Sequence, residues 1–245
     1  MIIMEMVRTV CLTKKYKDSV ALDRLNLEIE KGELFSLLGI NGAGKTTAIK
    51  LLSCLAAPTS GDAFIGGYSV IRDAMRVKRM IGVSPQETAV AYNLSVMENL
   101  ELMCGIHGFS GEKTAEKIRA LSEEFHLREI LSKKAGTLSG GFQRRLSIAM
   151  ALITEPEVLF LDEPTLGLDV IARSELWEVI RALKGRMTVI LTTHYMEEAE
   201  ALSDRIAIMK DGRLLVCDTA EEIKRRTGAE KFEEAFIRVV KGEGK

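Results

Sequence analysis

A glycine-rich loop between a buried strand and a helix is the sequence feature that most constrains the fold. Residues 39–47 read GINGAGKTT, with the apolar stretch ELFSLL before them and the helix-forming stretch AIKLL after them. This match to G-x-x-x-x-G-K-[ST] predicts a loop whose backbone N–H groups surround phosphate oxygens. The glycines let the chain bend closely, and the following helix adds the positive end of its dipole. The sequence therefore predicts an α/β fold with a phosphate site.

Within this phosphate loop (residues 39–47), two side chains carry chemistry of their own. Lys45 supplies positive charge to the β- and γ-phosphates of a nucleotide, and the Thr46 hydroxyl is a ligand for Mg²⁺. A chance glycine-rich turn would not require the strand and the helix that flank this one. The predicted contacts to the nucleotide are Asn41, Gly42, Ala43, Gly44, Lys45, Thr46 and Thr47.

Short apolar runs followed by turns or helical stretches recur along the chain, as buried parallel strands do. They lie at residues 34–38, 158–161, 187–193 and 206–209. Residues 7–12 and 21–29 alternate partially and predict an antiparallel β patch beside the main sheet.

The segment of about residues 87–137 has a different character from the rest of the chain. Ala115, Ile118, Leu121 and Phe125 recur there at helical spacing among charged residues, which predicts an inserted helical lobe. We therefore expect one domain over residues 1–245, with a core at 1–86 and 138–228 and a C-terminal helix with a frayed tail at 229–245.

Composition excludes several classes of protein. With 34 basic and 35 acidic residues the formal net charge of the 245-residue chain is -1, so no overall positive field indicates nucleic acid. The longest apolar runs fall far below the roughly 18 residues of a membrane span. We expect a cytoplasmic protein without a nucleic-acid partner.

A second buried strand ends in two acids. The run VLFLDEP, residues 158–164, places Asp162 at the carboxyl edge of the sheet, where ligands of α/β proteins gather. There Asp162 fits Mg²⁺ binding, and Glu163 can polarise a water that attacks the γ-phosphate. Such a pair alone is more often the start of a solvated loop, but the preceding phosphate loop favours a catalytic pair.

Read in order, six elements resemble the nucleotide-binding domain of ATP-binding-cassette (ABC) transporters, over about residues 7–228. These are Tyr16, the phosphate loop, Gln86 in IGVSPQ, LSGGFQRR from Leu138, VLFLDEP with LGLD (residues 166–169), and His194 in TTHYMEEAE. The resemblance implies a P-loop NTPase (RecA-like) core that hydrolyses ATP with Mg²⁺. It also implies a head-to-tail dimer, of two identical or two related subunits, with two ATP molecules between them.

The resemblance implies roles for the remaining residues. Tyr16 would stack on adenine, although a tyrosine at the rim or in the core is an equally good interpretation. Gln86 would reach Mg²⁺ or the attacking water, and His194 the γ-phosphate. Asp169 would couple the two sites across the dimer axis. The LSGG turn of the partner, Ser139, Gly140 and Gly141, would complete each site.

The stretches from residue 167 to 184 and from 192 to 226 resemble ATPase subunits of exporters for drugs, polysaccharides or ions. In that group an integral membrane permease is a separate chain, so we expect a protein peripheral on the inner face of the cell membrane. An importer subunit and a soluble ABC ATPase remain alternatives. A P-loop small-molecule kinase has no use for LSGG, LDEP and LGLD at these spacings.

Phe142 departs from the family pattern, which has glutamine at that position. On a helix over residues 141–153, Phe142 shares a stripe with Leu146, Ala149 and Ile153, with Arg144 and Ser147 roughly opposite. Phosphate contacts need only the Ser139 hydroxyl, nearby backbone N–H groups and the helix dipole. We therefore expect Phe142 to begin the buried face of the helix.

Overall fold

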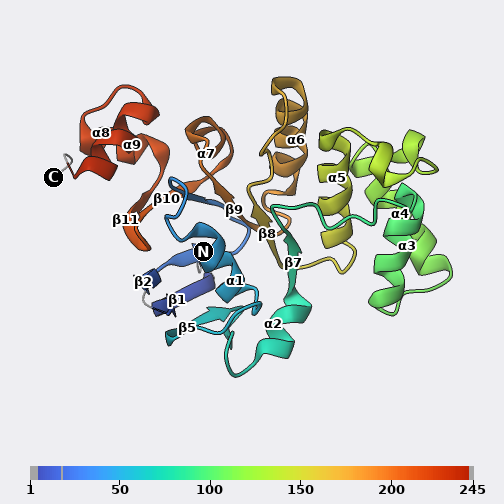
Figure 1. Ribbon diagram of the computed structural model, residues 1–245, viewed down its shortest axis with the longest axis horizontal. Helices are drawn as coiled ribbons and strands as arrows, with labels where there is room; N and C mark the ends of the chain where they lie inside the picture. Colours follow the sequence, from blue (N-terminus) through green and yellow to red (C-terminus); the bar gives the residue numbers. More distant parts are fainter. Residues whose placement is uncertain (1–4, 18, 243–245) are drawn as a thin grey trace.

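The computed structural model describes residues 5–17 and 19–242, and it contains two β-sheets with helices around them (Figure 1). The outermost residues of the predicted domain and tail, 1–4 and 243–245, lie outside the described residues. The larger sheet is six-stranded, with the spatial order β11-β10-β4-β9-β8-β7. Its strands are β4 (Leu34–Leu38), β7 (Ile81–Ser84), β8 (Val158–Asp162), β9 (Thr188–Thr193), β10 (Arg205–Lys210) and β11 (Arg213–Asp218).

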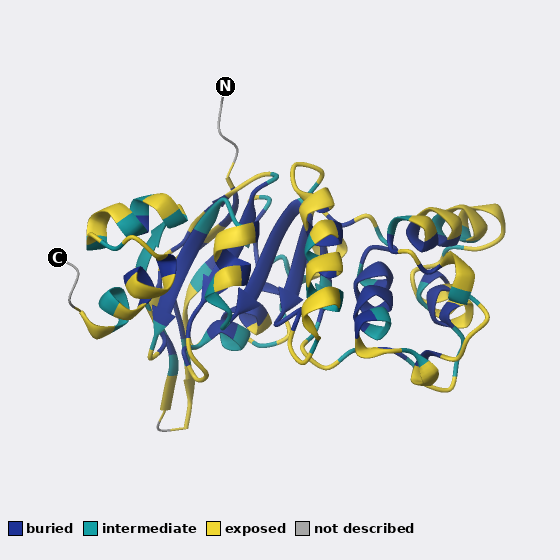
Figure 2. Ribbon diagram, turned by 90° about the horizontal axis from the view of Figure 1, so that it is seen from above, coloured by how far each residue is buried: buried dark blue, intermediate teal, exposed yellow. Residues whose placement is uncertain are grey.

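Strands β10, β4, β9, β8 and β7 are parallel neighbours. Strands β4, β8 and β9 are buried along their whole length, as their apolar runs predict (Figure 2). In the register of the sheet, Leu38 pairs with Thr193 and Asp162 with Thr192. The residues that follow these strands therefore meet at one edge, where Gly39, Glu163 and His194 lie.

The predicted antiparallel patch is a five-stranded sheet in which the predicted strand 21–29 is divided. Strand β2 ends at Leu25, which pairs with Leu12 of β1, and after Asn26 and Leu27 the pairing with β1 resumes in β3. The hairpin β5–β6, with its mixed polarity, was not predicted. The strands are β1 (Glu5–Tyr16), β2 (Ser19–Leu25), β3 (Glu28–Glu30), β5 (Ser60–Ile65) and β6 (Tyr68–Ser69).

Among the described residues, two α-helices precede the segment predicted as a lobe, two lie within it and five follow it. Helix α1 (Lys45–Leu52) follows the phosphate loop and α2 (Ala74–Met80) precedes β7, while α3 (Val96–Ile106) and α4 (Glu112–Glu124) occupy the segment predicted as a lobe. In the predicted stripe of α4, Ile118, Leu121 and Phe125 are buried, but Ala115 is exposed. The others are α5 (Gly140–Ala151), α6 (Val170–Leu183), α7 (Met196–Leu202), α8 (Ala220–Thr227) and α9 (Phe232–Lys241), with short 3₁₀ turns at Arg128–Ile130 and Ala135–Thr137.

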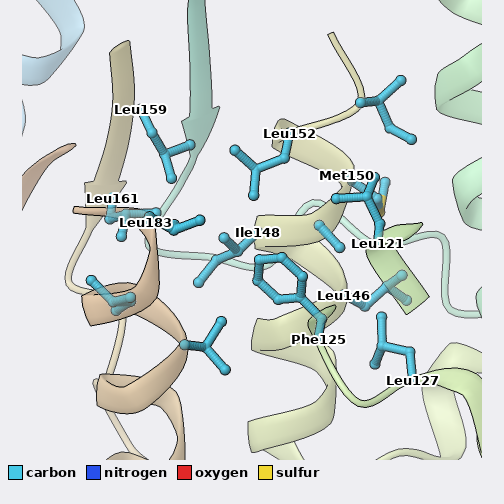
Figure 3. Close-up of a cluster of buried hydrophobic side chains, with 14 of the residues drawn as sticks. Leu121, Phe125, Leu127, Leu146, Ile148, Met150, Leu152, Leu159, Leu161 and Leu183 are labelled. Atoms are coloured by element: carbon cyan, nitrogen blue, oxygen red, sulfur yellow. The ribbon is translucent and has the colours of Figure 1, made fainter. Parts of the chain in front are cut away.

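Helix α5 joins the helical segment to the main sheet, and it lies between α6 and α3 (Figure 1). Figure 3 shows Phe125, just past α4, against Leu146 and Ile148 of α5, with Leu161 of β8 beyond them. All four side chains are fully buried in one apolar cluster. Burial of such a side chain contributes about 1.5–3 kcal/mol, so this packing fixes α5 relative to the sheet.

Candidate functional site

The phosphate loop is shaped by two left-handed glycines and one close approach. Gly42 and Gly44 have φ angles of 82° and 98°, which side chains other than glycine adopt at a cost. A Cβ at Gly39 would lie 2.5 Å from the Met209 carbonyl oxygen. Gly44 caps α1 without a side-chain hydrogen bond, so the N–H groups at this helix end are open to an anion.

Lys45 lies across this loop. Its Nζ donates to the Gly39 carbonyl oxygen at 2.6 Å and lies 3.3 Å from Oε1 of Glu163. The Lys45 side chain is 6% exposed and that of Glu163 7%. A buried ammonium and a buried carboxylate therefore lie in contact beside the phosphate loop.

Asp162 lies among hydroxyl groups from two other elements. Its Oδ1 accepts from Thr46 Oγ1 on α1 at 3.2 Å and from Thr192 Oγ1 on β9 at 2.5 Å. Carboxylate and hydroxyl oxygens are the ligands that Mg²⁺ prefers. The donor set at Thr46 and Asp162 therefore fits this cation.

Glu163 and His194 form a close pair at the ends of adjacent strands. Nδ1 of His194 lies 2.6 Å from Oε2 of Glu163. Glu163 has a φ of 50°, an unusual conformation that costs of order 1–3 kcal/mol and is typical of functional sites. Hydrogen bonds from its N–H to the Thr192 carbonyl oxygen and hydroxyl hold this conformation. Its carboxylate is thereby fixed between Lys45 and His194.

One cavity of about 570 Å³ brings most of the predicted residues together. Besides the predicted side chains, Ser19, Val20 and Ala21 of β2 and Leu166 line it. Ser19, Val20 and Ala21 belong to no motif, and Leu166, although it begins LGLD, was not predicted to contact the nucleotide. The predicted residues along this cavity are Asn41, Gly42, Ala43, Gly44, Lys45, Thr46, Thr47, Gln86, Glu163 and His194.

Tyr16 does not line this cavity. It ends β1 in the hairpin to Ser19, its side chain is 46% exposed, and the Lys14 ammonium lies 5.0 Å from its ring centroid. Stacking on adenine stays a prediction.

The LSGG turn and Asp169 lie together but outside the cavity. Ser139 caps α5 and accepts from the Phe142 N–H at 3.5 Å, and Asp169 caps α6 and accepts from the Ala172 N–H at 2.9 Å. A Cβ added at Gly141 would lie 3.1 Å from Cβ of Ala172. Ser139 and Gly140 are exposed, so this helix N-terminus faces outward from its own subunit.

Two residues of α5 were predicted on a face opposite the buried stripe, yet both are buried. Arg144 is 5% and Ser147 3% exposed, because β7 and the loop after it cover that face. The stripe itself is confirmed at Leu146, Ala149 and Ile153, which are fully buried. Phe142 is only partly buried and packs at the margin of the apolar cluster.

Comparison with known proteins agrees with this geometry. A family model described as ABC transporter matches residues 22–166. The daunorubicin resistance ATP-binding protein DrrA3 of Streptomyces coeruleorubidus is 42% identical over 90% of this chain and 70% of its own length. The probable multidrug ABC transporter ATP-binding protein YbhF of Escherichia coli is 39% identical over 94% of this chain, which spans only 40% of YbhF.

A solved structure is also similar: a dimeric ATP-binding cassette in a post-hydrolysis state, bound to ADP and Pi. It superposes with a TM-score of 0.79 at 29% identity and covers 87% of this chain and 98% of its own. The fold and the site define a P-loop NTPase. The chain belongs to the ABC transporter family, and binding and hydrolysis of ATP are its activity.

Proposed function

We propose that this chain is the ATP-hydrolysing subunit of an ABC exporter, acting with a separate membrane permease from the inner face of the membrane. The observation that carries the catalytic part is the contact of Glu163 with both Lys45 and His194 beside the phosphate loop. No helix of the described residues is both long and apolar enough to cross a membrane. Transport therefore requires another chain or segment. The drug-related names of DrrA3 and YbhF favour an exporter over an importer.

In this proposal the γ-phosphate of ATP lies in the phosphate loop against Lys45. Glu163 accepts a proton from the attacking water as general base, and His194 holds the carboxylate in place through its Nδ1 contact. Thr46, Asp162 and Gln86 would hold Mg²⁺, which offsets phosphate charge when bound. Catalysis then depends on positioning and charge.

The dimer follows from the placement of the LSGG turn. Ser139 and Gly140 lie at an exposed helix N-terminus, a favourable site for phosphate, but they do not line the cavity of their own subunit. A second subunit, identical or related, would bring its turn against the bound ATP. Asp169 lies beside that turn and would lie in the same interface between the two subunits.

The test is ATP-dependent dimerisation of Glu163→Gln, measured by light scattering after size exclusion with ATP and Mg²⁺. We expect a stable dimer with ATP and a monomer with ADP, because ATP that is not hydrolysed keeps the subunits together. Gly140→Asp added to this variant should prevent the dimer, since its carboxylate would face the γ-phosphate, whereas the neutral Gly140→Asn should allow it. A monomer under all conditions would contradict the proposed dimer.

The transport part needs its own experiment. Affinity purification from membranes of the native host should recover the chain together with an integral membrane protein. The purified complex, reconstituted into vesicles, should then transport the permease's substrate across the membrane. It should do so only when ATP is present on the side of the membrane where this chain lies. Recovery with ribosomes or DNA in place of a membrane protein would contradict the proposal.

A further inference from the structure

Helix α5 links the LSGG turn to the loop that carries Gln86. The turn forms its N-terminus, and Arg144 lies one turn further along, about 6 Å by the rise of an α-helix. The Arg144 guanidinium donates from Nη1 to the Pro85 carbonyl oxygen at 2.6 Å and from Nη2 to the Gln86 carbonyl oxygen at 2.5 Å. One side chain thus holds two successive carbonyl groups of the loop.

A second contact keeps this face of α5 against β7. Ser147 Oγ lies 3.0 Å from Oγ of Ser84, the last residue of β7, and the pair is buried. Arg144 and Ser147 are three residues apart, so they share a helix face. The helix is therefore attached at two consecutive points to the segment that ends in Gln86.

The Arg144 contact is a costly one to break. Its side chain is 5% exposed. Burial lowers the pKa of the guanidinium, and the neighbouring Asp162 carboxylate partly opposes that shift. A buried charged donor that loses its acceptors keeps its full desolvation cost. A shift of α5 therefore moves the Pro85–Gln86 backbone with it, and moves the Gln86 side chain within the cavity.

We propose that Arg144 is a positioning residue that transmits the placement of the LSGG turn to Gln86. When the turn contacts the ATP of one site, Arg144 sets Gln86 in the other site, so that hydrolysis there depends on closure of the dimer. This inference rests on the proposed functions of the LSGG turn and Gln86. It adds a physical link between them within one subunit.

Arg145 provides a matched control because it is also buried and is the next residue of the same helix. Its Nη2 lies 2.6 Å from Oε2 of Glu175 on α6, so its contact is directed away from the Gln86 loop. Loss of either arginine removes a buried charge from α5. Only the loss of Arg144 frees the loop.

The experiment is a double-mutant cycle on ATP turnover by the full chain with Mg²⁺. We expect Gln86→Ala and Arg144→Gln each to lower kcat about tenfold, which corresponds to one lost positioning interaction. In the Gln86→Ala background Arg144→Gln should cost less than about twofold, because coupled residues are not additive. Arg145→Gln should lower kcat by the same factor in both backgrounds.

Equal slowing by Arg144→Gln in both backgrounds would overturn the inference and leave the proposed function intact. Normal turnover by Gln86→Ala would overturn the proposed role of Gln86 and this inference with it. If Arg144→Gln fails to fold, Arg144→Lys replaces it, since lysine keeps the charge but lacks the fork that spans two carbonyl groups. The same non-additivity with Gln86→Ala is then expected, and additivity again overturns the inference.

Discussion

Nδ1 of His194 lies 2.6 Å from Oε2 of Glu163, although the two residues are 31 positions apart in the chain. They follow the neighbouring parallel strands β9 and β8, whose ends meet at the edge of the sheet beside the phosphate loop. The other carboxylate oxygen, Oε1, faces Lys45. Glu163 is thus oriented from both sides before any water or phosphate contacts it.

Glu163→Gln should bind ATP but turn it over at least ~100-fold more slowly, the scale expected for loss of a positioned catalytic group. Glutamine keeps the shape of the side chain but is a poor base. The measurement is steady-state phosphate release beside a nucleotide-binding titration. Glu157→Gln is a matched control, because Glu157 lies exposed just before β8, at the opposite end of that strand. Near-normal turnover by Glu163→Gln would refute the assignment.

Lys45→Ala should weaken nucleotide binding itself by about 10- to 100-fold, since a charged hydrogen bond contributes about 1.5–3 kcal/mol. A titration with a fluorescent ATP analogue measures this loss. Lys50→Ala, an exposed lysine on the same helix, should bind as the wild type does. Unchanged affinity of Lys45→Ala, with a fall in kcat alone, would show that Lys45 acts only in the transition state.

The sequence predicted the residues with distinctive chemistry better than it predicted the surfaces between them. The order of the motifs was sufficient to predict that the side chains at one edge of the sheet lie close together, because the carboxyl ends of parallel strands lie at the same edge. These side chains are Lys45, Thr46, Asp162, Glu163 and His194. The burial of Arg144 could not be predicted, since helical periodicity shows which face is apolar but not that a second surface covers the polar face. Strand β11 was not predicted either, although its residues 214–217 form a short apolar run, LLVC.

Phe142→Gln should keep most ATPase activity and lose about 1 kcal/mol of unfolding free energy. The Phe142 side chain packs at the margin of the apolar cluster, with the Arg145 guanidinium 5.3 Å from its ring centroid. The cap of α5 uses its backbone N–H instead. Urea denaturation and phosphate release measure the two effects. Leu146→Ala, fully buried one turn later, should lose about 3 kcal/mol, and a folded but inactive Phe142→Gln would contradict this interpretation.

Glu198 is a buried acid on α7 whose protonation should make stability depend on pH. Its side chain is 0% exposed, and its Oε1 accepts from Trp177 Nε1 at 3.0 Å. Burial raises the pKa of Glu198, hydrogen bonds such as that from Trp177 partly oppose this shift, and the Glu163 carboxylate adds a smaller upward contribution. The folded protein therefore binds a proton here that the unfolded chain releases above its ordinary pKa of 4.5.

The stabilising contribution of Glu198 is thus fully present below that ordinary pKa and is lost as the pH rises toward the folded value. Glu198→Gln imitates the protonated acid, and its side-chain oxygen still accepts from Trp177, so its stability should not fall in this way. We expect urea denaturation to show the variant more stable than the wild type at about pH 8, with a smaller difference at about pH 5. The exposed neighbour Glu197→Gln should follow the wild type at both values. A constant difference between Glu198→Gln and the wild type at both pH values would mean that Glu198 has the same protonation state in the folded and unfolded chain.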